Sequence, residues 1–355
     1  MRILITGICG FVGSQLALGL LARLPGVSIV GIDSLIRRGS ELHRQTLIDA
    51  GIKIIHGDIR CASDLESLGP TDWVIDAAAN PSVLAGVDGR TSSRQLVEHN
   101  LAGTVNLLEY CKLHRAGLVI LSTSRVYSVN ALLSVPLTLR DNAFVPDTTK
   151  PMPAGCSSQG ITEDFSTTAP ITLYGATKLS SEVLALEYGQ VFNIPVIVNR
   201  CGVMAGAGQL GTAEQGIFSF WVRAHALKRP LKYIGFTGLG QQVRDAFHPD
   251  DLAELLIKQF ARPAEASGVW NVAGGAENAM SLAQLTRWCD EHSGKHPVAS
   301  EPAPRPMDVP WLVMDSARVR QHFDWAPKLS LTHILEQILA HHRQRPDWLD
   351  RCRPL

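Results

Sequence analysis

The chain has 355 residues, 45% of them hydrophobic, and 33 basic residues balance 33 acidic ones. This length suffices for two lobes around a shared core, and a net charge of zero gives no field that would attract nucleic acid or an anionic membrane. The seven cysteines are scattered without a CxxC pair or a Cys/His cluster, which predicts neither a disulfide framework nor a metal site. No apolar stretch approaches the roughly 20 residues that span a bilayer, and no signal peptide is recognisable, so we expect a cytoplasmic protein.

Short apolar runs alternate with helical patterns through the first 200 residues. The runs predict strands over Arg2–Thr6, Ser28–Ile32, Lys53–His56, Trp73–Ala77, Gly117–Ser122 and Val196–Asn199, and the spacing between them predicts helices over Phe11–Leu24, Gln95–His114 and Tyr174–Phe192. Strands joined by helices of this length require crossover connections. The predicted fold is therefore α/β, with a doubly wound parallel sheet of the Rossmann type.

The segment Thr6–Gly13 follows the first strand directly and opens the first helix. Its glycines allow a tight turn and a close approach of the backbone to a pyrophosphate, which the helix N-terminus can hold. Asp33 ends the second strand about 20 residues later, where a carboxylate can accept hydrogen bonds from an adenosine ribose. We predict NAD rather than NADP, because Asp33 would repel a 2′-phosphate. Arg37 and Arg38 leave NADP open, although we interpret both as solvated loop charges.

The pattern lapses between Tyr127 and Pro170, a stretch rich in proline, serine and threonine. A structureless segment of about 40 residues inside a compact domain is usually functional or an insertion. From Met204 onward shorter elements predict a smaller C-terminal lobe, with helices near Ile217–Ala226, Leu252–Ala261, Ser281–His292 and Leu331–His341. The expected domains are residues 1–199 plus about 239–265 for the cofactor, and about 200–238 plus 266–355 for the substrate.

Tyr174 and Lys178 are four residues apart on one predicted helix and so share a face. On that face an ammonium can lower the pKa of a phenol from about 10 toward neutrality, and it can also donate to a cofactor ribose. Thr123, at the end of a strand, is placed to hydrogen-bond the substrate hydroxyl that Tyr174 deprotonates. A nucleophilic role for Ser122 or Ser124 is disfavoured, because no histidine–carboxylate arrangement is suggested near them.

These motifs together resemble the extended short-chain dehydrogenase/reductase family. The resemblance rests on the GxxGxxG spacing, Asp58 after His56-Gly57, Thr123 before Val126-Tyr127, Tyr174-x-x-x-Lys178, Arg244-Asp245 and Arg305. It implies NAD and a nucleotide-diphosphate sugar as ligands, and a C2 homodimer, or a dimer of dimers, formed by two of the predicted helices. The helices that would pair with their copies are Gln95–His114 and Tyr174–Phe192.

The resemblance also implies roles for single residues. Asp58 would approach the adenine, Asn100 would organise the active-site backbone and water, and Arg244 and Arg305 would clamp the diphosphate. The expected cofactor-binding residues are Gly7, Gly10, Phe11, Val12, Gly13, Asp33, Asp58, Ile59, Ala77, Ala78, Ala79, Asn100, Tyr174 and Lys178. The expected substrate-binding residues are Ser124, Arg125, Gln209, Gln215, Arg244 and Arg305, and the catalytic residues are Thr123, Tyr174 and Lys178.

Ser124 and Arg125 stand where the family's dehydratases carry an Asp-Glu pair, which disfavours elimination. The segment 206–216 resembles the CDP-paratose (CDP-tyvelose) 2-epimerases, which likewise carry a basic residue where Arg125 stands. It departs from them at Gly208 and Ala213, as does Ala205 just before it. Val203 replaces an asparagine of UDP-galactose-type 4-epimerases.

The sequence thus predicts an NAD-dependent nucleotide-sugar epimerase, acting by transient oxidation at C2 of a CDP-hexose. A 4-epimerase or reductase acting on another nucleotide sugar remains an alternative. A non-catalytic, NAD-sensing protein of the same fold is the third possibility.

Overall fold

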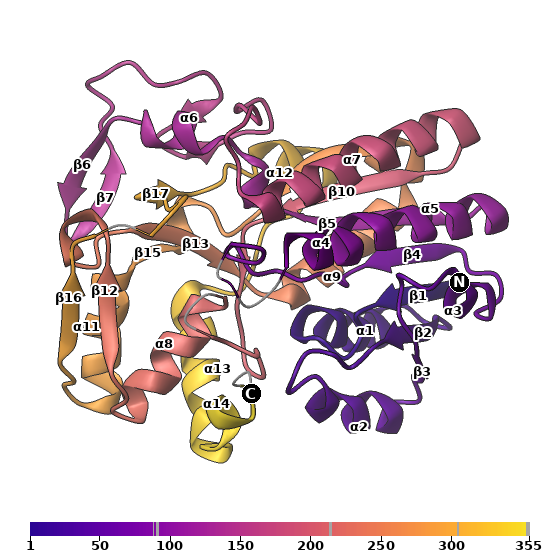
Figure 1. Cartoon of the computed structure of the whole chain (residues 1–355), viewed down its shortest axis with the longest axis horizontal. Coiled ribbons are helices and arrows are strands. Elements are labelled where there is room, and N and C mark those ends of the chain that lie inside the picture. The colour runs from indigo at the N-terminus through magenta and orange to yellow at the C-terminus, as the bar shows by residue number, and fades with distance from the viewer. Residues whose placement is uncertain (88, 90–91, 213–214, 304, 353–355) are drawn as a thin grey trace.

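The computed structural model describes residues 1–355 except 88, 90–91, 213–214, 304 and 353–355. Its main sheet has seven parallel strands in the order β14-β10-β5-β4-β1-β2-β3 (Figure 1). The predicted doubly wound sheet is confirmed. The strands are β1 (Arg2–Thr6), β2 (Ser28–Asp33), β3 (Lys53–His56), β4 (Trp73–Asp76), β5 (Gly117–Thr123), β10 (Val196–Cys201) and β14 (Gly268–Val272).

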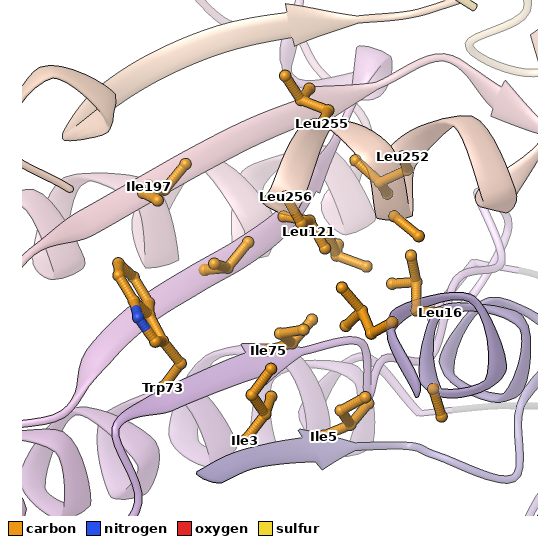
Figure 2. Packing of buried hydrophobic residues seen from close by; sticks show 14 of the residues in the cluster. Ile3, Ile5, Leu16, Trp73, Ile75, Leu121, Ile197, Leu252, Leu255 and Leu256 are labelled. Carbon is orange, nitrogen blue, oxygen red and sulfur yellow. The ribbon is translucent and has the colours of Figure 1, made fainter. Parts of the chain in front are cut away.

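Helices cover both faces of this sheet. Successive strand residues point to opposite faces, so each buried strand supplies two separate apolar clusters. One cluster packs Ile3, Ile75 and Ile197 against α1 (Phe11–Arg23) and α9 (Pro249–Ala261), as Figure 2 shows. The other packs residues such as Leu4, Val74 and Val198 against α5 (Gly103–His114) and α7 (Leu173–Phe192).

The helix predicted over 95–114 is three pieces in the structure. A π-helical turn, η1 (Glu98–Ala102), separates α4 (Ser93–Val97) from α5. The Gly103 N–H donates to the Glu98 carbonyl, five residues back. π turns are rare in proteins overall, and those that occur often lie at functional sites.

Two strands belong to the opposite domain from the one to which the boundary expected near residue 265 assigns them. β14 pairs with β10 and is the seventh strand of the main sheet. The sequence did not predict it, because the polar Asn271 interrupts its apolar run. β13 (Val243–Phe247) belongs instead to a small sheet with three short strands. These are β11 (Val203–Met204), β15 (Ala279–Ser281) and β17 (Trp311–Leu312).

The smaller lobe has its own apolar core, which includes Trp221, Leu285 and Ile338. Its main helices are α8 (Ile217–Ala226), α11 (Leu282–Ser293) and α13 (Leu331–Gln344), and β12 (Leu231–Ile234) pairs with β16 (Val298–Glu301). The remaining helices outside the insertion are α2 (Glu41–Asp49), α3 (Ala62–Glu66), α10 (Pro263–Ala266), α12 (Ala317–Phe323), α14 (Trp348–Arg351) and the 3₁₀ turns η2 (Ser124–Val126), η3 (Phe236–Gly238) and η4 (Ala276–Asn278). No helix in the part of the chain that the structure describes is long and apolar enough to cross a membrane.

The proline-rich insertion is more ordered than its sequence suggests. It forms a helix and two hairpins that pack around Trp311 of the small sheet. Both guanidinium Nη atoms of Arg287 donate to the Asp141 carboxylate, at 2.8 and 2.7 Å, which fixes the tip of the first hairpin on α11. The elements are α6 (Val129–Leu133), β6 (Leu137–Arg140), β7 (Ala143–Pro146), β8 (Cys156–Ser157) and β9 (Gly160–Ile161).

Candidate active site

A cavity of about 840 Å³ lies where the carboxyl ends of the main-sheet strands face the smaller lobe. Open α/β sheets bind ligands at this edge. All the expected site residues line the cavity except Asn100 and Lys178, which are buried just behind its wall. No described residue of the 129–170 insertion lines it.

The glycine turn is shaped as a cradle. Gly7 has a φ of +60°, and a Cβ placed on Gly13 would lie 2.4 Å from the Gly7 carbonyl oxygen. The helix α1 begins after Gly10, which offers no side chain to cap the N–H groups of the first turn. Those N–H groups remain available to an anion, so these residues fit the diphosphate of NAD.

Two carboxylates that line the cavity lie at the carboxyl ends of the next two strands, Asp33 at β2 and Asp58 just after β3. Asp33 accepts hydrogen bonds from the Cys9 and Leu35 N–H groups, each at 2.8 Å, which fix its orientation beside the turn. Burial raises the pKa of Asp33, while these backbone hydrogen bonds lower it. Asp58 forms an ion pair with Arg60 at 2.6 Å, and this partner lowers the pKa of Asp58. Both positions suit the adenosine end of a dinucleotide.

We expect the protein to bind NAD more tightly than NADP, because the fixed Asp33 carboxylate would repel a 2′-phosphate. Calorimetric titration with both cofactors measures the difference. Asp33→Asn removes the negative charge and should reduce the difference in affinity between NAD and NADP. Asp49→Asn, at the end of α2, should leave that difference unchanged. Equal affinity of the wild-type protein for the two cofactors would show that Asp33 does not contact the ribose.

Arg37 is not the solvated charge that the sequence suggests. Its guanidinium donates to the Gln215 side-chain oxygen at 2.5 Å and to the Leu210 carbonyl at 2.6 Å. Gln215, an expected substrate-binding residue, thus already has a protein partner. Arg38 is exposed, as interpreted from the sequence.

Three successive carbonyls of the lobe segment beside the cavity are held by side chains from other elements. His43 Nε2 lies 3.1 Å from the Gly208 oxygen, Trp348 Nε1 donates to the Gln209 oxygen at 3.1 Å, and Arg37 donates to Leu210. Side chains from other elements thus hold residues 208–210 in place. Gln209 itself donates to the Met204 carbonyl at 2.7 Å. Ala213, one of the departures from the 2-epimerase pattern, lies outside the described residues.

Tyr174 lies at the start of α7, and only 8% of its surface is exposed. Burial raises the pKa of Tyr174 to about 12, opposed by a side-chain hydrogen bond with Thr123 and by the positive charge of Arg125. The structure thus brings Thr123 and Tyr174 together as expected.

The charge of Lys178 acts on two buried groups behind the cavity. It lowers the pKa values of Asp76 and Cys201, both of which burial raises. Asp76 also accepts a hydrogen bond from the Thr6 hydroxyl at 2.9 Å. The expected lowering of the Tyr174 pKa by Lys178 stays a prediction. Asp76 was missed, although an acid ending an apolar strand was a visible signal.

Asn100 holds the backbone that follows β4. It sits in the π turn, donates to the Asn80 carbonyl at 3.1 Å and to the Thr177 hydroxyl at 3.2 Å, and accepts from the Asn80 N–H at 2.8 Å. Its amide is fully used by the protein, so its geometry suits the expected organising role rather than a direct ligand contact.

The opposite end of the cavity carries the expected substrate arginines. Arg244 donates to Asp308 at 3.0 Å and to the Val309 and Val243 carbonyls at 2.8 and 2.7 Å. Burial lowers the pKa of Arg244 to about 10. Ser124, Arg125 and Arg305 line the same cavity.

Comparison with known proteins gives a consistent result. Residues 3–273 match the model of the NAD dependent epimerase/dehydratase family. The chain is 28% identical over 341 residues to a CDP-paratose 2-epimerase of Salmonella typhi, covering 93% of this chain and 96% of that one. It is 27% identical to a UDP-glucose 4-epimerase of Azospirillum brasilense, covering 92% and 87%.

Among solved structures, the UDP-glucuronic acid 4-epimerase of Bacillus cereus, in complex with UDP-glucuronic acid and NAD, superposes with a TM-score of 0.78. The two are 25% identical, and the match covers 97% of this chain and 99% of that one.

Proposed function

The chain belongs to the NAD-dependent epimerase/dehydratase family, and from this premise we propose that it is a nucleotide-sugar epimerase acting at C2 of a CDP-hexose. NAD is its cofactor. We choose epimerisation over dehydration because of which carboxylates line the cavity. Among the described residues lining the cavity these are Asp33, Asp58 and Asp308: the first two lie at the carboxyl ends of β2 and β3, and the third is paired with Arg244. Elimination of water would need a free carboxylate beside Tyr174, where Ser124 and Arg125 stand.

The side chains divide the work as follows. Tyr174, as phenolate, accepts the proton of the sugar hydroxyl and later returns it, while Thr123 orients that hydroxyl. NAD, when bound, supplies the acceptance and return of a hydride at the sugar carbon. Arg244 and Arg305 hold the diphosphate, Ser124 and Gln209 contact the sugar nucleotide, and Lys178 positions the cofactor.

The position and the base are proposed from two likenesses. Residues 206–216 resemble the 2-epimerase segment, and the full-length likeness to the Salmonella 2-epimerase is slightly higher than to the Azospirillum 4-epimerase. Incubation with CDP-paratose, UDP-glucose and UDP-glucuronic acid in parallel, followed by NMR of the products, tests this choice. Conversion of a UDP-sugar alone would establish the 4-epimerase alternative. Net consumption of added NADH would establish a reductase.

A substrate deuterated at the epimerised carbon should keep its label after turnover in ordinary water. The hydrogen would leave the sugar as a hydride, be held on the bound cofactor and return to the same carbon, so it would not exchange with solvent. Mass spectrometry of the product measures retention, and parallel turnover of unlabelled substrate in D₂O is the control. Washout of deuterium would refute transient oxidation, even if the enzyme proves to be an epimerase.

We also propose a homodimer, or a dimer of such dimers, through α5 and α7. These neighbouring helices expose apolar side chains such as Leu113 (69%), Val183 (56%) and Val191 (67%), which a partner copy would cover. Light scattering at micromolar concentration should give at least twice the chain mass. Val183→Glu should shift the protein to monomer, whereas Leu239→Glu, at an exposed apolar position elsewhere, should not. A monomeric wild-type protein would contradict the proposal.

A further inference from the structure

His43 lies between two backbone carbonyls that belong to different parts of the molecule. It is on α2, and its ring nitrogens lie 2.9 Å from the Cys9 oxygen (Nδ1) and 3.1 Å from the Gly208 oxygen (Nε2). Cys9 is in the glycine turn, whereas Gly208 is in the smaller lobe. Several of the residues that follow, between 209 and 218, line the cavity. One side chain therefore joins the turn that suits the cofactor to the lobe side of the cavity.

The two contacts together need a ring that carries two protons. A carbonyl oxygen only accepts hydrogen bonds, and a neutral imidazole has one N–H donor and one lone pair. A neutral His43 can therefore donate to one of the two carbonyls, and it turns a lone pair toward the other. The imidazolium has two N–H donors and satisfies both carbonyls. The complete link is thus a property of the charged ring.

The next two carbonyls of the lobe segment are held by groups that do not titrate near neutral pH. Trp348 Nε1 donates to the Gln209 oxygen, and the Arg37 guanidinium donates to the carbonyl after it. An indole N–H and a guanidinium keep their protons at physiological pH. Of the three side chains that hold residues 208–210, His43 is therefore the one whose donors depend on pH.

The turn, β2 and α2 surround one side of the ring. Burial lowers the pKa of His43, while its two carbonyl partners and the charges of Asp33 on β2 and Glu41 on α2 raise it. The Cys9 thiol stays neutral, because burial raises its pKa to about 12. Arg44, also on α2, is exposed. The second proton therefore binds to His43 below the ordinary titration range of a histidine.

The helices α13 and α14 face the other side of the ring. Burial lowers the pKa of His341 on α13 to about 4, and the charge of His43 is among those that lower it further, so His341 stays neutral. Arg345, on the same helix, lines the small cavity beside His43 and opposes a positive charge there. The Trp348 ring of α14 lies 5.7 Å from the His43 ring between centroids, where an aromatic face favours a cation.

We propose that His43 positions the lobe segment in response to the cofactor, and that this link is complete only when both ring nitrogens are protonated. NAD bound to the glycine turn fixes the Cys9 carbonyl, and His43 passes this constraint to Gly208. His43 exchanges no proton with the substrate. It is a positioning residue that acts through the two carbonyls. The inference rests on the proposed function only in taking the lobe side of the cavity as the side of the sugar nucleotide.

Hydrogen exchange measured by mass spectrometry tests this link in the full chain, with and without saturating NAD at each pH. NAD should slow the exchange of the backbone amides in residues 206–212 by about 5-fold or more, the lower end of typical couplings between sites. The slowing should increase as the pH falls from about 8 to about 5, because His43 gains its second proton. His43→Phe keeps an aromatic ring beside Trp348 and removes both N–H donors, so it should lose most of the slowing.

Two further variants separate this role from a general loss of packing. His292→Phe is the matched control, because His292 Nδ1 meets a single carbonyl, that of Trp288, within α11. The slowing should remain in this variant. His43→Gln keeps N–H donors that do not titrate, so the slowing that it retains should be the same at both pH values. Exchange in the glycine turn reports NAD binding by each variant.

Full wild-type slowing in His43→Phe would mean that NAD reaches the lobe segment without His43, and it would overturn the proposal. So would the absence of slowing in the wild-type protein, or a slowing that does not change between the two pH values. If His43→Phe does not fold, the pH comparison between the wild-type protein and His43→Gln decides. The measurement needs no sugar nucleotide, so failure to convert a CDP-hexose would refute the proposed function without affecting this inference.

Discussion

Replacing Tyr174 with phenylalanine should lower turnover by about 10²–10⁴-fold while NAD stays bound. The ring fills the same space, and only the oxygen that exchanges the proton and meets Thr123 is lost. Product formation from the converted nucleotide sugar measures kcat, and calorimetry measures NAD affinity on the same sample.

Thr123→Val is the graded comparison for this variant. It removes one hydrogen bond to the substrate hydroxyl but leaves proton transfer possible, so its loss of turnover should be smaller. Near wild-type turnover in Tyr174→Phe would remove this residue from the mechanism, and a larger loss in Thr123→Val would reverse the two roles.

Glu182→Gln should reduce the free energy of unfolding by about 3–5 kcal/mol. Glu182 lies on α7 one and two turns beyond Lys178 and Tyr174. Its carboxylate accepts hydrogen bonds from the Ser122 hydroxyl and the Arg200 guanidinium. The ion pair with Arg200 is 2.8 Å long, and both of its side chains are almost fully buried. Removing the negative charge leaves Arg200 buried without compensation. Urea denaturation measures the change.

Glu98→Gln provides the matched control, because Glu98 pairs with Arg94 at 2.7 Å on the surface. Exposed pairs contribute about 0–1 kcal/mol, so its effect should be small. The double variant Glu182→Leu/Arg200→Met removes both buried charges and should regain much of the lost stability. Equal effects of Glu182→Gln and Glu98→Gln would show that the buried network contributes no more than a surface pair.

The sequence predicted what depends on local periodicity and on motif spacing. Six strands and the glycine turn follow from short-range patterns, because strand ends and helix faces are set by neighbouring residues. The pairing of Thr123 with Tyr174 joins β5 to α7, and it was expected from the catalytic motifs and not from local periodicity. The seventh strand, β14, did not stand out because the polar Asn271 interrupts its apolar run. The insertion was misjudged because its hairpins are stabilised by distant partners, such as Arg287 for Asp141.

Long-range contacts account for the rest of the unpredicted site. Arg37 meets Leu210 and His43 meets Gly208 across more than 150 residues, and neither side chain belongs to a recognisable motif. Spacing places Lys178 on the same helical face as Tyr174, whereas the packing of η2 against Gly175 at the start of α7 is a tertiary contact that spacing does not show.

The π turn at Glu98–Ala102 has a consequence for insertions and deletions. A π turn holds one residue more than the α-helix around it, so this helix contains a surplus residue. Deleting Ala102 would let α-helical hydrogen bonding run unbroken, and the element would remain a helix. The surplus residue is accommodated within the turn, so α4 and α5 would keep their faces, whereas Asn100, inside the turn, would lose the direction that points its amide at Asn80. We therefore expect residue 102 to tolerate a substitution better than a deletion, because the site depends on the number of residues in this turn.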